Sequence, residues 1–80
     1  MSLRIIVKTD QIRDWIQTRG GTPALRNGTD GDVAVLFDGV KSDYEPLSVD
    51  ELIEAMKANR LVMLVDQEAG KTFHKFVRHS

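Results

Sequence analysis

The spacing of apolar residues changes along the chain, and each spacing predicts a different element. Apolar residues alternate with other side chains over residues 3–7, which predicts a short first strand. Apolar residues around Trp15 then recur at helical spacing, so we expect a helix of about residues 10–19. Gly20 follows at the place where a left-handed residue ends a helix. The chain therefore opens with a strand and a helix.

The second expected helix has the clearest start signal in the sequence. Ser48 and Glu51 form a capping box, in which each side chain accepts a hydrogen bond from the other residue's backbone N–H. Apolar residues recur at helical spacing behind them, and Asn59 can take the left-handed ending. We expect a helix of about residues 49–58, whose buried stripe contains Val49, Leu52, Ile53 and Met56.

Two continuous apolar runs, residues 33–37 and 61–65, predict strands that are covered on both faces. Each run has a turn and a second extended segment beside it in the sequence. Residues 23–26 precede the first run, and residues 72–78 follow the second. We therefore expect two β-hairpins, with the two apolar runs as the central strands.

The remaining segments limit the sheet. Pro23 cannot donate a backbone hydrogen bond, so its segment is expected at an edge or at the start of a strand. Residues 38–46 are expected to form an acidic loop. Together the elements predict a single α+β domain over residues 1–80. We expect one antiparallel sheet of four to five strands with two helices on one face, in the order βαββαββ.

The chain has 80 residues and no cysteine. A domain of this size buries only about 60–65% of its unfolded surface, which leaves little structure for a deep active site. The lack of cysteine excludes disulfides, thiolate nucleophiles and cysteine-ligated metal sites. The apolar run near residues 3–7 is too short for a signal peptide or a membrane span. We therefore expect a cytoplasmic protein without membrane contact.

The charged residues are segregated although the net charge is only −1. Residues 1–29 and residues 57–80 each carry five basic and two acidic side chains, whereas residues 30–54 carry eight acids and one lysine. An acidic band between two basic arms can be neutralised within the fold or across a homodimer. The balanced total argues against a dedicated nucleic-acid binder, whose surface is usually strongly basic.

Three local patterns suggest chemistry, and the sequence argues against each. Gly70-Lys-Thr72 resembles the end of a phosphate-binding loop, but Val65 replaces the required glycine and a strand is expected to follow. Asp30-Gly-Asp32 lacks the later glycine and glutamate of a calcium loop. His74 and His79 lie on opposite faces of an extended segment, and a hydrolase or transferase would need His74 in a pocket with a carboxylate. We expect no catalytic residue, no metal, no cofactor and no enzymatic activity.

The expected function is that of a small non-enzymatic binding or regulatory module that acts through protein–protein contacts, with a protein partner or as a homodimer. The alternative is nucleic-acid binding through Arg19, Arg26 and the C-terminal hairpin, where Phe73 and Phe76 could stack on bases. The glycine-rich stretch of residues 19–31 is the region to test first. The candidate binding residues are Trp15, Arg19, Gly20, Gly21, Arg26, Lys75 and Arg78.

Five short motifs occur in a familiar order. They are Trp15 followed by Arg19-Gly-Gly-Thr-Pro-Ala24, then Gly28-Thr-Asp-Gly31, Ser48-Val-Asp-Glu-Leu-Ile53, Asn59-Arg-Leu-Val-Met-Leu64 and Phe73-His-Lys-Phe-Val77. Their succession, over about residues 9–78, resembles a family of small uncharacterised bacterial proteins with RGGxPA, GTxG, SWDEFFE-like and NLALLY-like motifs. The resemblance implies this element order and a bacterial cytoplasmic setting, and it supplies no catalytic residue.

The chain departs from that family pattern mainly in its aromatic positions. Val49 stands where the pattern has tryptophan, Val65 replaces a tyrosine, and Leu52, Ile53 and Met56 replace phenylalanines. An aliphatic core can fill the same fold. Inferences that depend on those aromatic side chains therefore do not carry over.

Overall fold

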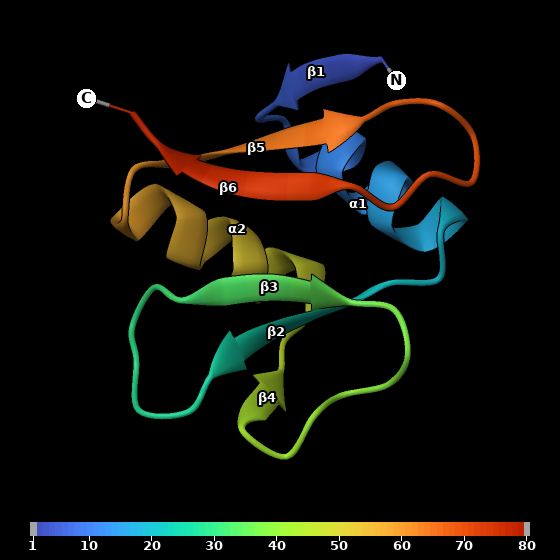
Figure 1. Ribbon diagram of the computed structural model, residues 1–80. Coiled ribbons are helices and arrows are strands. Elements are labelled where there is room, and N and C mark those ends of the chain that lie inside the picture. The colour runs from blue at the N-terminus through green and yellow to red at the C-terminus, as the bar shows by residue number, and fades with distance from the viewer. Residues whose placement is uncertain (1, 80) are drawn as a thin grey trace.

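The computed structural model describes residues 2–79, and it is an α+β domain with two helices and six strands among them (Figure 1). The elements follow one another as β1 (Leu3–Ile6), α1 (Thr9–Thr18), β2 (Thr22–Arg26), β3 (Val33–Leu36), β4 (Tyr44–Pro46), α2 (Val49–Ala58), β5 (Leu61–Asp66) and β6 (His74–Arg78). The α+β class, the antiparallel pairing and both helices are confirmed. The predicted order lacks one strand, β4.

The expectation of one sheet with four to five strands is wrong, because the strands form two separate three-stranded sheets. The first sheet has the order β1-β5-β6, and the second has the order β3-β2-β4. An aromatic contact lies between the two sheets. The rings of Phe37, directly after β3, and His74, at the start of β6, lie edge to face with centroids 5.8 Å apart.

Helix α2 holds the two sheets together, since it contacts β5 of the first sheet and both β2 and β3 of the second (Figure 1). The predicted capping box is confirmed. The Ser48 N–H donates to Glu51 Oε1 at 2.8 Å, and the Glu51 N–H donates to Ser48 Oγ at 3.1 Å. The core contains Leu52, Ile53 and Met56 from α2, Ile12, Trp15 and Ile16 from α1, and Ile6, Val33, Val35, Met63 and Val65 from the strands.

Both hairpins are confirmed, but the central strand of the second sheet is not the apolar run. β2, which contains Pro23, lies in the middle, and β3 lies at an edge. The ladder tolerates the proline because β4 ends beside it. The Leu47 N–H donates to the Pro23 carbonyl at 2.8 Å, and only the reciprocal bond is lost, since proline has no N–H. In the first sheet β5 is central, as predicted.

The segment of residues 38–46 is not only a loop. Its last residues, Tyr44–Pro46, form β4 and pair with β2, with Arg26 opposite Tyr44 and Leu25 opposite Glu45. The strand is three residues long, which is too short for a periodic signal to appear in the sequence. Its pairing nevertheless converts β2 from an edge strand into a central one.

Candidate functional site

Arg19 is the first predicted binding residue, and its guanidinium is used inside the fold. It stacks over the Trp15 ring, with Cζ 4.6 Å from the ring centroid. Its Nη2 donates to the backbone carbonyls of Glu68 at 2.8 Å and Asp66 at 3.3 Å, and its Nε donates to the carbonyl of Lys71. Arg19 therefore fastens the turn between β5 and β6 to the end of α1.

The other predicted binding residues around Arg19 also have roles in the fold. Trp15 is 5% exposed, and its indole N–H donates to the Asp66 carbonyl at 2.8 Å. Gly20 has φ +69°, so the predicted left-handed helix ending is confirmed. Gly21 lies so close to the core that an added Cβ would be 2.6 Å from Val35 Cγ1. These residues explain the glycine-rich stretch by backbone geometry and packing.

Arg26 lies on β2, and neighbouring side chains engage its guanidinium. Its Nε lies 3.0 Å from Asp32 Oδ2, and its Nη2 lies 3.2 Å from the Tyr44 hydroxyl. The hydrogen bond to Tyr44, followed by the charges of Tyr44, Asp32 and Asp43, raises the pKa of Arg26. Arg26 is thus partly neutralised by the acidic middle segment.

The predicted basic residues do not gather into one patch. Arg19 contacts the turn that leads into β6, whereas Arg78 lies at the opposite end of β6, paired with Leu61. Lys75 lies between them, but strand alternation directs its side chain to the other face of the sheet from Arg78. Arg26 belongs to the second sheet.

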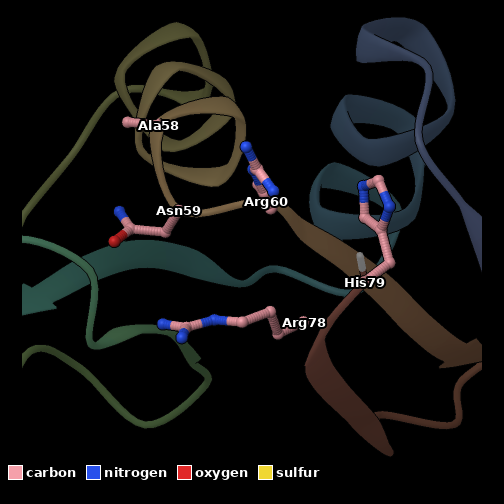
Figure 2. Close-up of a pocket in the computed structure, with 5 residues that line it drawn as sticks. All are labelled: Ala58, Asn59, Arg60, Arg78 and His79. Atoms are coloured by element: carbon pink, nitrogen blue, oxygen red, sulfur yellow. The ribbon is translucent and has the colours of Figure 1, made fainter.

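A different basic cluster forms where α2 ends and β5 begins. A shallow hollow of about 660 Å³ is lined there by Ala58, Asn59, Arg60, Arg78 and His79 (Figure 2). Arg60 comes from the end of α2, whereas Arg78 and His79 come from the end of β6. The His79 N–H donates to the Arg60 carbonyl at 2.9 Å, which fixes the two segments side by side. Among the described residues, the lining contains two arginines and a histidine and no carboxylate.

The cations of this cluster have no ion-pair partner among the described residues. The two ion pairs found in residues 2–79 are Arg13 with Asp50 and Arg26 with Asp32. Lys57, which directly precedes Ala58 on α2, is exposed and takes part in neither, and the same holds for Arg60 and Arg78. Their positive charge is therefore directed to solvent.

Arg60 also has an unusual backbone. It is the only non-glycine residue in the described chain with a positive φ, at 54°. It follows Asn59, the last residue of the α2 cap, and so occupies the position where helices usually place glycine. A side chain there costs about 1–2 kcal/mol, because Cβ crowds the following carbonyl.

Asn59 lies between the end of α2 and the β2–β3 turn and forms hydrogen bonds to both. Its Nδ2 donates to the Ala55 carbonyl at 2.9 Å and to the Asp30 carbonyl at 3.3 Å. Gly31 packs so tightly against it that an added Cβ would lie 2.5 Å from the amide. Asn59 therefore holds the β2–β3 turn against the end of α2 and keeps the wall of the hollow in place.

A second hollow of about 490 Å³ adjoins the first and shares Arg60 and His79 with it. Apart from these two residues and Lys57, its lining is apolar. The apolar residues are Val7, Ile53, Met56, Leu61 and Val62. The pair of hollows thus combines a cationic half and an apolar half around shared side chains.

Sequence reasoning missed Lys57, Asn59 and Arg60 as site residues, although a signal was present. The predicted hairpin of residues 61–65 and 72–78 brings the start of one strand beside the end of the other. That register places Arg78 and His79 next to Arg60. The His74 ring, in contrast, lies among aromatic rings, with Trp15 at 5.7 Å and Phe76 at 5.8 Å between centroids.

Asp66 is the one buried charged residue among those described, and it lies at the Arg19 end of β5. Its Oδ1 accepts from the Glu68 N–H at 3.0 Å and from the Ser2 N–H at 3.3 Å. The hydrogen bond from Glu68, opposed by desolvation and assisted by the bond from Ser2, lowers the pKa of Asp66. Its carboxylate therefore stabilises the turn and is not poised for proton transfer.

Comparison with known proteins adds no relative. No protein-family model, no curated protein and no solved structure matches the chain. The resemblance to small bacterial proteins stays a prediction. Within residues 2–79, no helix is long and apolar enough to cross a membrane, and no group of three or more histidine or acidic side chains is placed to hold a metal ion.

Proposed function

We propose that this chain is a non-enzymatic binding module that acts through protein–protein contacts, and that its contact surface is the outer face of the first sheet. Strand register places seven side chains on this face: Leu3, Ile5, Val62, Leu64, Asp66, Lys75 and Val77. Five of the seven are apolar, and Asp66 is buried and accepts hydrogen bonds from the backbone N–H groups of Ser2 and Glu68. The observation that carries the proposal is the exposure of the apolar side chains, which reaches 60% at Ile5, 46% at Leu3 and 38% at Val77.

The two faces of the first sheet are used differently. The inner face carries Ile6, Met63 and Val65, which are at most 4% exposed, and packs into the core with the helices. The outer face was expected to be covered as well, because residues 61–65 are continuously apolar. The largest exposed apolar patch of a soluble protein, typically a few hundred Å² in area, often serves binding.

The charge on the outer face indicates the chemistry of the partner. Lys75 lies in the same row as Ile5 and Leu64, and it has no ion pair among the described residues. A lysine that is desolvated in an interface requires an opposite charge. The proposed partner is therefore a protein that presents apolar side chains around a carboxylate, which meets Lys75.

The size of the face limits the strength of the contact. Three strands of five residues cover roughly 250 Å², from the usual strand spacing and rise. A standard interface uses about 800 Å² on each partner. Exposed neighbours, Val7 at 57% and Phe73 at 46%, can extend the patch, but the contact belongs to the small and reversible class.

Other parts of the proposal rest on the sequence. The regulatory role is proposed from the lack of a catalytic residue pattern and from the segregated charge, and the bacterial cytoplasmic setting is proposed from the family resemblance and the lack of cysteine. Nucleic-acid binding through Arg19 and Arg26 has less support, because the protein's own carbonyl, hydroxyl and carboxylate groups bind both guanidiniums.

The test compares proteins recovered from a bacterial lysate by the immobilised chain and by two matched variants. Ile5→Glu places a charge in the outer face, whereas Val40→Glu places the same charge on an exposed apolar residue in the loop after β3. We expect one or more proteins to be retained by the original chain and by Val40→Glu, and lost with Ile5→Glu. Lys75→Glu should weaken the same contact.

Sedimentation over a range of concentrations gives the second readout. Reversible dimerisation that Ile5→Glu abolishes and Val40→Glu leaves intact would make a second copy the partner, and would exclude the acidic partner proposed above. The proposed function fails if the chain stays monomeric and if no recovered protein distinguishes Ile5→Glu from Val40→Glu.

A further inference from the structure

We propose that the two adjoining hollows at the C-terminal end of α2 form a nucleotide site. The phosphate would lie in the cationic half, which Arg60 and Arg78 line (Figure 2). The base would lie in the apolar half, over Met56 and Leu61. The ligand is either a free nucleotide or one nucleotide unit of a single strand, because both present the same phosphate and base.

The positive charge at this end is more than α2 requires. Cations near the C-terminus of a helix offset its dipole, and Lys57 meets that need within the last turn. Arg78, in contrast, comes from β6 and faces the hollow from the other side. Among the described residues, no carboxylate lines either hollow. Two arginines from different elements, both without an ion pair in the described part of the chain, offer the bidentate donors that phosphate oxygens accept.

The backbone of Arg60 is an independent observation. Left-handed non-glycine residues persist where the surroundings impose them, and they are enriched at ligand sites. Here the cap of α2 imposes the conformation, and glycine would fit it with less strain. An arginine at this position directs a charged fork towards the two hollows at the expense of stability. That combination points to a binding role for the side chain.

The apolar hollow accounts for the second half of the ligand. Its floor consists of Ile53 and Met56, which belong to the core, and the half-buried Leu61 and Val62. A free phosphate ion would leave this surface unused. A planar base can cover it, and the shared Arg60 and His79 can stack on the base from the polar side. Apolar and cationic halves side by side therefore favour a nucleotide over an inorganic anion.

The test measures binding of four probes by two-dimensional NMR of the isotope-labelled chain: adenosine, AMP, inorganic phosphate and an oligo-dT strand. We expect AMP to bind more tightly than either adenosine or phosphate, with shifts in the backbone signals of residues 56–62 and 78–79. A single-strand ligand would be shown if oligo-dT binds more than about tenfold tighter than AMP and loses affinity steeply with salt. A free-nucleotide ligand would be shown by the reverse order.

Two variants and one control locate the site. Arg60→Gly removes the guanidinium at a position where glycine fits the backbone, so it should fold at least as well and lose roughly tenfold or more in AMP affinity. Arg78→Gln should lose a similar factor without touching that backbone. Lys41→Gln removes one positive charge from the exposed loop before β4 and should leave the affinity unchanged.

The inference is overturned if no probe shows saturable binding, or if Arg60→Gly and Arg78→Gln bind AMP as the original chain does. Its failure does not touch the proposed protein contact, because Ile5 and Lys75 line neither hollow, although the two surfaces meet at Val7 and Val62. Conversely, Ile5→Glu should leave AMP binding intact.

Discussion

Both helices end in a residue with the left-handed backbone conformation, which is a glycine after α1 and an arginine after α2. α1 ends at Arg19 and Gly20, where the glycine takes the left-handed conformation with φ +69°. α2 ends at Asn59 and Arg60, where the arginine takes it with φ 54°. At the first end the arginine is half-buried and its guanidinium binds backbone carbonyls. At the second end the arginine is exposed and has no ion pair among the described residues.

The difference between the two helix ends distinguishes an arginine that stabilises the fold from one that is a candidate for binding. At the α1 end, each residue type suits its backbone and its contacts, so structure alone explains Arg19 and Gly20. At the α2 end, Asn59 makes side-chain hydrogen bonds to the rest of the fold, whereas the Arg60 guanidinium forms no ion pair among the described residues that would offset the backbone strain. A residue that strains the fold while facing an open hollow is a better functional candidate than one that the fold already uses.

The largest effect is expected from breaking the α1 end. Arg19→Ala removes the donors that serve the carbonyls of Asp66, Glu68 and Lys71, and it uncovers the Trp15 ring. We expect the free energy of unfolding to fall by about 2–3 kcal/mol, because carbonyls in the turn lose their partners. Urea unfolding followed by Trp15 fluorescence measures the change.

Arg13→Ala is the matched control, since Arg13 lies on the same helix and pairs with the exposed Asp50 at 3.1 Å. Exposed pairs contribute about 0–1 kcal/mol, so this variant should lose far less stability. Arg19→Lys should recover only part of the loss, because an ammonium lacks the planar fork that reaches several carbonyls. Equal losses for Arg19→Ala and Arg13→Ala would show that the carbonyl contacts contribute little.

Exchanging the residue types at the two left-handed positions gives a smaller effect of opposite sign. Gly20→Ala should lower the free energy of unfolding by about 1 kcal/mol through backbone strain. No steric clash adds to this loss, because an added Cβ meets no atom within 4 Å. Arg60→Gly should raise it by about 0.5–1 kcal/mol, since relief of strain exceeds the entropy gained by the unfolded chain. Thermal and urea unfolding of both variants check the two signs.

Asparagine distinguishes strain from lost contacts at both positions, because it tolerates the left-handed region better than other non-glycine residues. Gly20→Asn should therefore cost less than Gly20→Ala, and Arg60→Asn should be at least as stable as the original chain. A loss of stability in Arg60→Gly and Arg60→Asn alike would mean that the arginine side chain makes stabilising contacts, and the contrast between the two helix ends would disappear.

The local parts of the fold were predictable from sequence, and the long-range parts were not. The capping box at Ser48, the ending at Gly20 and both hairpins depend on neighbouring residues, and all appear in the structure. The split into two sheets depends on β1 pairing with β5, far along the chain, and no local pattern encodes that choice. The central strand of the second sheet was mispredicted for the same reason, because β4, which pairs with β2, is too short to show a period.

The same distinction applies to the basic residues. The hairpin register could have placed Arg78 beside Arg60, since it needs only the turn and the two strand patterns. Nothing near Arg19 in the sequence shows that three carbonyls from residues 66–71 converge on it. Sequence reasoning therefore selected the arginine beside the glycines and passed over the one that the structure leaves open.

The smallest expected effect is on the pH dependence of stability. It distinguishes the two helix ends because a carboxylate accepts hydrogen bonds at the α1 end. The α1 end depends on Asp66, whose pKa is lowered chiefly by the hydrogen bond from the Glu68 N–H, whereas no carboxylate of residues 2–79 lines the hollow at the α2 end. Because the folded pKa lies below the unfolded one, Asp66 contributes stability above the unfolded pKa of about 3.9, and that contribution disappears as pH falls through the folded pKa.

Urea midpoints measured between pH 6 and pH 2 should therefore fall less steeply for Asp66→Asn than for the original chain. Glu54→Gln, which changes an exposed carboxyl group on α2, should follow the original curve. Identical curves for all three would mean that the turn held by Arg19 does not need the ionised carboxylate, and that its backbone carbonyls alone define the α1 end.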